Sequence, residues 1–407
     1  MRVGVVGGGQ LAWMMADAAK ALDVQLVVQT PNHDDPAVAI AAETIFAPVD
    51  DAAATAQLAT RCDVITFENE FVNLKALSIL AEQDVCFRPS LQVLAPLLDK
   101  YQQRCYLKQL SLPVPEFVAL EESRGAGVRG CSGAGESIDP NFPLHNVLTQ
   151  LGFPTVLKAR RHGYDGQGTF IVKDLDALEQ RLAASSSHQS LFLLEEFVPF
   201  ERELAIIAAR STRGEIVTYP IVETQQEEQV CRRVLVPADL SSAIEAEIKA
   251  IAHTLLNSLQ AVGVFGIELF LCSDGKVLVN EIAPRTHNSG HFSLDASKTS
   301  QFEQHLRAVC GLPLGDPSLQ CEGAVMVNLL GYEHSQDDYL AQRQQLSQLP
   351  QAHVYWYGKP QSRPGRKLGH VTVLQSDNSL DRGVAIAQRS TQGRIAQTVE
   401  SIWYGGK

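Results

Sequence analysis

The chain has 407 residues, of which 45% are hydrophobic and 20% charged, and its formal net charge is −12 at pH 7. This composition is typical of a globular protein, and the length predicts two or three domains. The negative charge disfavours a nucleic-acid-binding role, which requires a broad basic face. The sequence has no apolar run of membrane-spanning length and no signal-peptide pattern in MRVGVVGGGQ, so we expect a cytoplasmic protein without a membrane partner.

The N-terminal residues are expected to form an open, mostly parallel sheet. The predicted elements alternate in β-glycine-α-β order: a strand at 2–6, a helix at about 10–22, and strands at 24–28 and 63–70. Ligands of such sheets bind at the carboxyl ends of the strands. Gln10 and Glu68 each follow one of these ends, so both are candidate ligand contacts.

The first strand is followed by Gly7-Gly8-Gly9-Gln10-Leu11-Ala12, which fits the G-x-G-x-x-A pattern of a dinucleotide-binding turn. That pattern also requires an acidic residue at the end of the second strand, where this chain has Gln29. An NAD-dependent oxidoreductase is therefore disfavoured. Two interpretations remain open, a turn whose backbone amides hold an anion and a turn with a structural role only.

The central part of the chain combines a lysine with a glycine-rich loop. The expected elements are a helix at about 99–111, an exposed, mobile insertion at 121–143, strands at 155–160 and 169–173, a helix at 174–184, a strand at 191–198, antiparallel hairpins over 203–223 and a helix at about 241–260. Lys158 lies on the first central strand, before the loop Gly163-Tyr164-Asp165-Gly166-Gln167-Gly168. Glycines let backbone N–H groups approach phosphate oxygens and a lysine supplies charge, so this arrangement suits ATP phosphates. A plain surface loop is the alternative.

The strand Leu194-Glu195-Glu196-Phe197-Val198 ends in carboxylates between apolar residues. Such a carboxylate and the adjacent backbone can meet an adenine amino group and ribose hydroxyls. An edge-strand end with solvated charge is the alternative. The eight cysteines of the chain show no C-x-x-C spacing, and we expect them to be reduced thiols.

Two later strands, VFGIELFL and VLVNEIA, are joined by Ser273-Asp274-Gly275-Lys276. If Asp274 and Gly275 are the centre of a two-residue turn, Glu268 lies directly opposite Glu281. Facing carboxylates repel, and a hard cation such as Mg²⁺ would turn the repulsion into a binding site. A longer turn would remove this geometry.

Two polar segments complete the candidate site. The run from Arg285 to His291 offers donors for a small oxyanion and histidines for proton transfer, unless it only orders its own loop. After about residue 315 we expect a short tail with more strands. There, Lys359, Arg363, Arg366 and Lys367 form a basic cluster that suits a terminal phosphate, with a charged surface loop as the alternative.

The order of these motifs resembles the ATP-grasp superfamily and, within it, the N5-carboxyaminoimidazole ribonucleotide synthase family. The resemblance is carried by GGGQL, RRHGYDGQG, NEIAPRTHNSGH and YWYGKPQSRPGRKLGH. It implies an α/β ATP-grasp fold with a Rossmann-like domain at 1–98, an ATP-grasp domain at 99–315 whose glycine-loop subdomain spans about 113–197, and a small β-rich domain at 316–407.

The resemblance also implies residue roles. ATP would contact Lys100, Lys158, Gly163, Tyr164, Asp165, Gly166, Gln167, Gly168, Thr169, Glu195, Glu196, Phe197, Val198, Glu203, Gln226, Asn280 and Glu281. Mg²⁺ would be bound by Glu268 and Glu281. The substrate aminoimidazole ribonucleotide would contact Gln10, Leu11, Glu68, Asn288, Lys359, Arg366 and Lys367. The catalytic residues near bicarbonate and the reacting amine would be Tyr164, Asp165, Arg285, His287 and Ser289.

The implied reaction is an ATP- and bicarbonate-dependent carboxylation through carboxyphosphate, in purine biosynthesis, by a homodimer. Gln167 and Gln226 depart from the common pattern, which has Arg or Lys at the first position and often His at the second. The related formate-dependent glycinamide ribonucleotide transformylase usually has Glu-Leu where this chain has Gln10-Leu11, and it lacks a THNSGH segment. A non-catalytic ATP-binding regulator would be expected to have lost one of the two metal carboxylates.

Overall fold

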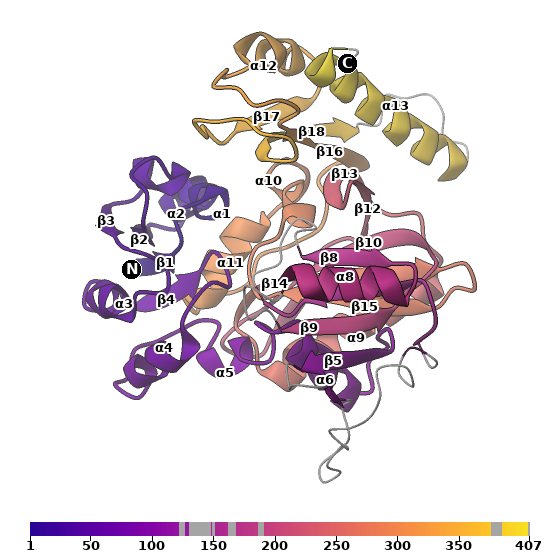
Figure 1. Cartoon of the computed structure of the whole chain (residues 1–407). Coiled ribbons are helices and arrows are strands. Elements are labelled where there is room, and N and C mark those ends of the chain that lie inside the picture. The colour runs from indigo at the N-terminus through magenta and orange to yellow at the C-terminus, as the bar shows by residue number, and fades with distance from the viewer. Residues whose placement is uncertain are drawn as a thin grey trace. The chain divides into compact units, whose positions relative to one another are not determined.

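The computed structural model describes residues 1–121, 127–129, 148, 151–161, 168–185, 191–375 and 385–405. The chain divides into two compact units. Unit 1 comprises Met1–Val93, Glu203–Ile267 and Ala283–Lys407, and unit 2 comprises Leu94–Arg202 and Glu268–Ile282. Figure 1 labels their elements, and each unit is described by itself below.

The N-terminal part of unit 1 is the predicted parallel sheet, with strand order β3-β2-β1-β4. Its strands are β1 (Arg2–Val6), β2 (Gln25–Thr30), β3 (Glu43–Phe46) and β4 (Val64–Phe67). Strands β1, β2 and β4 are largely buried, as expected for a parallel sheet covered by helices (Figure 1), whereas only Ile45 of the edge strand β3 is buried. The predicted helix at 10–22 was wrong in one respect, because it is broken at Met14 and Met15 into two short helices.

The helices around this sheet are α1 (Gln10–Trp13), α2 (Ala16–Ala21), the 3₁₀ helix η1 (Pro36–Ala39), α3 (Ala52–Ala59), α4 (Leu74–Ala81) and α5 (Leu91–Leu94). Gln29, at the place of the missing acid, is fully buried. Its amide donates to the carbonyls of Pro48 and Asp51 and accepts from the Thr55 hydroxyl. Its role is therefore to fasten the sheet to α3.

The second sheet of unit 1 is antiparallel over the pairs β10-β12-β13-β16-β18-β17, with β14 beside β10 and β11 also paired to β10. Its strands are β10 (Phe200–Arg210), β11 (Ile216–Thr218), β12 (Val222–Glu227), β13 (Val230–Val236), β14 (Gly263–Cys272), β16 (Gly323–Leu330), β17 (Ala352–Trp356) and β18 (Lys367–Gln375). Its helices are α9 (Ser242–Leu259), η3 (Asn288–Gly290), α10 (Ser293–Ala296), α11 (Gln301–Val309), α12 (Leu340–Ser347) and α13 (Ala385–Tyr404).

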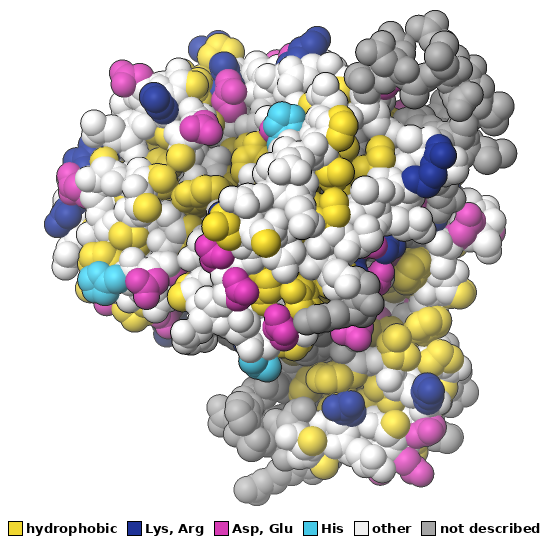
Figure 2. Space-filling view, turned by 90° about the horizontal axis from the view of Figure 1, so that it is seen from above, with side chains coloured by type: hydrophobic (Ala, Val, Ile, Leu, Met, Phe, Trp, Pro, Cys, Tyr) yellow, Lys and Arg dark blue, Asp and Glu magenta, His cyan; other side chains and the backbone are white. Residues whose placement is uncertain are grey.

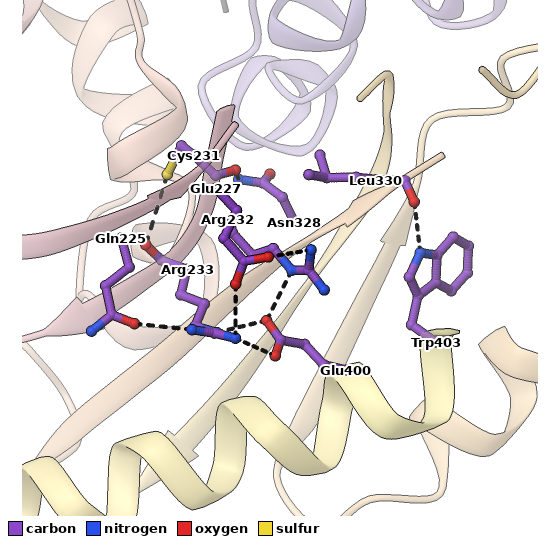
Figure 3. A network of polar contacts seen from close by, with 9 residues as sticks. All are labelled: Gln225, Glu227, Cys231, Arg232, Arg233, Asn328, Leu330, Glu400 and Trp403. Atoms are coloured by element: carbon purple, nitrogen blue, oxygen red, sulfur yellow. Dashed lines mark hydrogen bonds and ion pairs between the residues drawn. The ribbon is translucent and has the colours of Figure 1, made fainter. Parts of the chain in front are cut away.

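The C-terminal region contains helices as well as the expected strands. In α13, Ala396, Val399 and Trp403 are buried and pack with apolar residues of β16 and β18. Glu400 of the same helix forms ion pairs with Arg232 and Arg233 of β13 (Figure 3). Apolar packing and charge therefore both attach α13 to the sheet, and the expectation of a short tail of strands was incomplete.

Unit 2 contains a five-stranded sheet of order β6-β5-β9-β7-β8 and the hairpin formed by the end of β14 with β15 (Val277–Ala283). The other elements are β5 (Phe117–Glu121), β6 (Gly127–Arg129), β7 (Thr155–Ala159), β8 (Thr169–Val172), β9 (Phe192–Glu196), α6 (Lys100–Gln109) and α8 (Leu175–Ser185). The predicted mobile insertion at 121–143 includes β6, which pairs with β5, while most of it lies outside the described residues.

Three further expectations concern the whole chain. Among the described residues, no helix is long and apolar enough to cross a membrane. On the face shown in Figure 2, Lys and Arg side chains stand between acidic and uncharged ones instead of forming a continuous basic field. The expectation of reduced cysteines holds for the free cysteines Cys62, Cys86, Cys231, Cys272, Cys310 and Cys321 and was wrong for Cys105, which is disulfide-bonded.

Candidate active site

The glycine turn after β1 holds a carboxylate of the chain itself. Glu68 follows β4 and is buried, and its two oxygens accept the backbone N–H groups of Gly9 (2.8 Å) and Leu11 (3.1 Å). A Cβ atom on Gly9 would lie 2.4 Å from Glu68 Oε1, so the close approach requires glycine. The anion position of this turn is therefore filled by Glu68, which gives a physical reason why a dinucleotide phosphate is not expected there.

The surroundings of Glu68 raise the pKa of its carboxyl group overall. Burial raises the pKa of its carboxyl group, while the two backbone N–H groups and Arg285 act to lower it. Arg285 Nε itself forms an ion pair with Glu70 Oε1 at 2.8 Å. Glu68 and Arg285 were both predicted site residues, and unit 1 thus brings them within electrostatic range.

The polar loop after β15 is ordered by hydrogen bonds. His287 Nδ1 lies 2.8 Å from the Ser289 hydroxyl and also accepts the Ser289 backbone N–H at 3.4 Å. An accepting Nδ1 places the proton of a neutral imidazole on Nε2, which can donate it. The buried Gln301 amide accepts from the His287 N–H (2.9 Å) and donates to the His287 carbonyl (2.7 Å). The loop is therefore held in one conformation from α11.

Asn288 forms a reciprocal amide pair with Asn328 of β16, at 2.9 and 2.8 Å. The predicted phosphate-binding residues lie in the segment from β17 to β18. Lys359 Nζ donates to the Lys367 carbonyl at 2.8 Å, and Arg366 donates to the Gln361 carbonyl at 2.7 Å. The side chains of Lys359 and Arg366 are therefore both held by backbone carbonyls of their own segment.

In unit 2, Lys158, Glu195 and Arg104 form a buried ionic triad. Glu195, with 2% of its side chain exposed, meets Arg104 Nε at 2.5 Å with one oxygen and Lys158 Nζ at 2.6 Å with the other. Burial acts to raise the pKa of Glu195, but the two cations outweigh it and lower this pKa to about 2. For Lys158, burial disfavours the charged ammonium and lowers its pKa, and the negative charge of Glu195 opposes that shift. The triad is stable because each buried charge has a partner.

Helix α6 carries Arg104 of this triad and a second cation, Lys100. Asp99 caps the helix by accepting the backbone N–H groups of Tyr101 and Gln102, so α6 begins at Lys100. Lys100 and Arg104 are four residues apart and therefore share one face. Lys100 Nζ meets Glu281 Oε2 at 2.5 Å. Helix α6 therefore contacts β9 through Arg104 and β15 through Lys100.

The facing geometry predicted for Glu268 and Glu281 was wrong. Cys272 N–H donates to the Lys276 carbonyl, Gly275 N–H donates to the Cys272 carbonyl, and Gly275 has a φ of 84°. The loop therefore has three residues, Ser273 to Gly275, and the register shifts by one. Asn280 takes the place opposite Glu268, and its Nδ2 lies 3.4 Å from Glu268 Oε2.

The metal site can still be tested against the donors present. The carboxylates of Glu268 and Glu281 offer oxygen ligands of the kind that Mg²⁺ prefers. The Lys100 ammonium occupies a position on the Glu281 carboxylate that a metal cation could take, so this carboxylate already has a positively charged partner. Among the described residues, no group of three or more His, Cys, Asp or Glu side chains forms a metal cage. The two carboxylates by themselves fit a divalent cation such as Mg²⁺.

The remaining predicted contacts are spread over several elements. Thr169 pairs with Lys158 across β7 and β8, and the Gly168 carbonyl accepts the Ala159 N–H. Glu196 accepts the Glu116 N–H, Phe197 is 38% exposed and Val198 is buried. Glu203 on β10 pairs with Thr224, and Gln226 is exposed beside a bulge in β12. Gly163, Tyr164, Asp165, Gly166 and Gln167 lie outside the described residues.

Sequence reasoning missed several partners. Arg104, Gln301, Asn328 and Glu70 each hold a predicted site residue, yet none belongs to a recognisable motif. The available signal was the polar residue Asn328 within the otherwise apolar strand GAVMVNLL. A buried amide needs hydrogen-bond partners, so its position pointed to a polar neighbour.

Comparison with known families defines the class of protein. The ATP-grasp domain family matches residues 136–302, the ribonucleotide synthetase preATP-grasp domain matches residues 1–96, and the phosphoribosylaminoimidazole carboxylase C-terminal domain matches residues 324–380. The chain is thus an ATP-grasp ligase that uses ATP, and the predicted fold is confirmed.

Individual relatives narrow the class. The N5-carboxyaminoimidazole ribonucleotide synthases of Synechococcus elongatus and a Synechocystis species are 54% and 48% identical, over 98% and 99% of this chain and 95% and 98% of theirs. A crystal structure of N5-carboxyaminoimidazole synthase from Aspergillus clavatus with ADP and 5-aminoimidazole ribonucleotide has a TM-score of 0.83 at 30% identity, over 98% of both chains. The chain belongs to the N5-carboxyaminoimidazole ribonucleotide synthase family.

Proposed function

We propose that the chain carboxylates 5-aminoimidazole ribonucleotide with ATP and bicarbonate. Bicarbonate attacks the γ-phosphorus of ATP, which forms carboxyphosphate and releases ADP. The substrate amine then attacks the carboxyl carbon, so that a C–N bond forms, the C–O bond to phosphate breaks and the amine loses a proton. The observation that carries the proposal is the sequence identity of 54% and 48% to synthases of this name, which extends over nearly the whole chain.

The unit 2 cluster supports the phosphoryl-transfer half. Phosphoryl transfer depends on positioning and on positive charge at the phosphate oxygens. Lys158 and Lys100 would supply that charge when they exchange their carboxylate partners for phosphate. Glu268 and Glu281 would hold Mg²⁺, which supplies further positive charge to the phosphates. Glu195 to Val198, Glu203 and Gln226 would contact the adenine and ribose.

The unit 1 cluster supports the carboxylation half. Arg285, His287 and Ser289 would hold bicarbonate, with His287 donating from Nε2. Gln10, Leu11, Glu68 and Asn288 would hold the imidazole and ribose of the acceptor. Lys359, Arg366 and Lys367 would bind its 5′-phosphate.

Four finer assignments belong to the same proposal. Asp165 acts as base on the amine, with Tyr164 beside it, and an Asp165→Asn variant with unchanged coupled turnover would remove that role. The domains are divided at 98/99 and 315/316. The enzyme works as a homodimer, which light scattering on the purified protein would test. It acts in the cytoplasm, and fractionation of its source cells would check that location.

The decisive assay is ADP release in the presence of Mg²⁺ and bicarbonate. We expect strong stimulation by 5-aminoimidazole ribonucleotide and none by glycinamide ribonucleotide with formate. Chelation of the metal should abolish turnover, and Mg²⁺ should restore it. Stimulation by the second pair of substrates, or by neither, would overturn the proposal.

A further inference from the structure

Asn328 is the single polar side chain of β16, and its place in the strand is unusual. All eight residues of β16 are buried, and Asn328 is 0% exposed. Alternation along the strand puts Asn328 on the same face as Ala324 and Met326, which lie in the apolar cluster around Phe292. A buried amide is costly unless its donors and acceptor are all used. Its presence in an apolar strand therefore requires a reason.

The hydrogen bonds of Asn328 supply that reason. Its Nδ2 donates to the Cys231 carbonyl at 2.9 Å and to Asn288 Oδ1 at 2.8 Å, and its Oδ1 accepts from Asn288 Nδ2 at 2.9 Å. Both N–H groups and the oxygen are thus used. The Cys231 carbonyl only accepts, so it dictates which end of the Asn328 amide carries nitrogen.

The Cys231 carbonyl is itself held in place. The next two residues, Arg232 and Arg233, both donate to Glu400 of α13, with Arg233 Nε and Nη2 at 2.6 and 2.5 Å from its two oxygens (Figure 3). Strand β13 also pairs with β16 from Arg233–Val327 to Val236–Ala324. The backbone acceptor that orients Asn328 therefore belongs to a fixed part of unit 1.

The orientation of the Asn328 amide determines the orientation of the Asn288 amide. Because Asn328 has one fixed orientation, Asn288 must accept with Oδ1 and donate one N–H of Nδ2. The second N–H of Asn288 and a lone pair of its Oδ1 are left for another group. Asn288 is partly exposed, whereas Asn328 is not, so only Asn288 is accessible to a ligand.

We propose that Asn328 is a positioning residue for the nucleotide substrate: it never touches the ligand, and it fixes the amide orientation with which Asn288 binds it. The inference rests on the proposed function, because it takes Asn288 as a contact to 5-aminoimidazole ribonucleotide. A donor at Asn328 Nδ2 is required, because two acceptors at residue 328 would bond equally well to either orientation of the Asn288 amide and would fix neither.

The test is a double-mutant cycle with Asn328→Asp and Asn288→Ala. Aspartate has the shape of asparagine but presents oxygen to the Cys231 carbonyl and to Asn288 Oδ1. We expect Asn328→Asp to raise KM for 5-aminoimidazole ribonucleotide roughly ten-fold, the loss of about one oriented hydrogen bond, with a much smaller change in KM for ATP. In the Asn288→Ala background the same substitution should add less than about two-fold, because residues that act through one another are not additive.

Two further variants separate positioning from folding. Asn328→Ser removes the donor to Asn288 without adding a charge, and it replaces the aspartate variant if that variant fails to fold. Gln392→Leu is the matched control, since Gln392 is also a buried amide that donates to a backbone carbonyl, that of Val236 at 3.0 Å, and it has no assigned place in the site. The control should lower the melting temperature and leave KM for the nucleotide unchanged.

The outcomes are distinguishable. Unchanged KM in a folded Asn328 variant, or equal effects with and without Asn288, overturns the positioning role while the proposed function stands. Failure of the wild-type enzyme to respond to 5-aminoimidazole ribonucleotide overturns the proposed function instead.

Discussion

The two candidate clusters are built from different interactions. In unit 2, Lys158, Glu195 and Arg104 satisfy one another by charge. In unit 1, Asn288, Asn328, His287 and Gln301 satisfy one another by neutral hydrogen bonds. Charged pairs can exchange partners when a more strongly charged ligand arrives, whereas neutral networks have fixed directions and specify shape. The cluster expected to bind ATP is therefore exchangeable, and the cluster expected to select the acceptor is preformed.

The largest effect should come from removing the exchangeable cation. We expect Lys158→Met to lower kcat/KM for ATP by about 10²–10³, because a donor to developing charge is lost. The fold should persist, since Glu195 keeps Arg104 as a partner. Steady-state kinetics with ATP varied provide the measurement, and Lys158→Arg, which keeps the charge, should lose less. A loss below about ten-fold would show that Lys158 is not the main phosphate donor.

The second prediction concerns the contribution of the charged cluster to the stability of the fold. Glu195 has a pKa lowered from 4.5 to about 2, so its ionised form stabilises the folded state fully above about pH 4.5. This contribution, about 3 kcal/mol, is lost as pH falls from 4.5 towards 2. Glu195→Gln should therefore be less stable than the wild type by about that amount at neutral pH, and the difference should shrink in acid.

Urea unfolding between neutral pH and about pH 3 measures this difference. Glu116→Gln is the control, because Glu116 meets Lys108 at 3.4 Å with both side chains exposed, and such a pair contributes below about 1 kcal/mol. A Glu195→Gln deficit that does not change with pH would contradict the electrostatic origin.

The third prediction disturbs the glycine turn that holds Glu68, a further predicted acceptor contact in unit 1. In Gly9→Ala the new Cβ would lie 2.4 Å from Glu68 Oε1, so the carboxylate must move off its two N–H donors. We expect KM for 5-aminoimidazole ribonucleotide to rise about ten-fold, and stability to fall by about 1–3 kcal/mol. Kinetics and thermal unfolding measure both. An equal rise in KM for ATP would argue against separate roles for the two clusters.

We expect the smallest effect from Gly393→Ala, which is the control for Gly9→Ala. Gly393 lies within α13, and a Cβ atom there would have no atom within 4 Å. Gly393→Ala should therefore stabilise the protein by about 0.5–1 kcal/mol, because glycine is unfavourable inside a helix. Thermal unfolding detects the gain. Destabilisation would mean that glycine substitutions in unit 1 are harmful for reasons other than the contact with Glu68.

The sequence predicts the sheets and the clusters better than their internal contacts. Apolar periodicity located most strands, and the motifs singled out Lys158, Glu68 and Asn288 as candidate site residues. The turn was misread because Asp-Gly suits both a two-residue turn and the last positions of a three-residue loop, and a single residue then changes every facing pair. Buried partners were missed for a different reason. Arg104 and Glu195 are 91 residues apart, and Asn288 and Asn328 are 40 apart, so no local pattern links them.

The placement of the three tryptophans gives the chain a built-in optical reporter. Trp13, Trp356 and Trp403 all belong to unit 1. Trp403 is buried with its indole N–H on the Leu330 carbonyl, and its ring lies 6.1 Å from that of Trp356. Intrinsic tryptophan emission therefore reports the unfolding of unit 1, while circular dichroism records the loss of secondary structure in both units. A tryptophan introduced at Phe200, which stacks on Phe270 within unit 2, would make that unit visible by the same method.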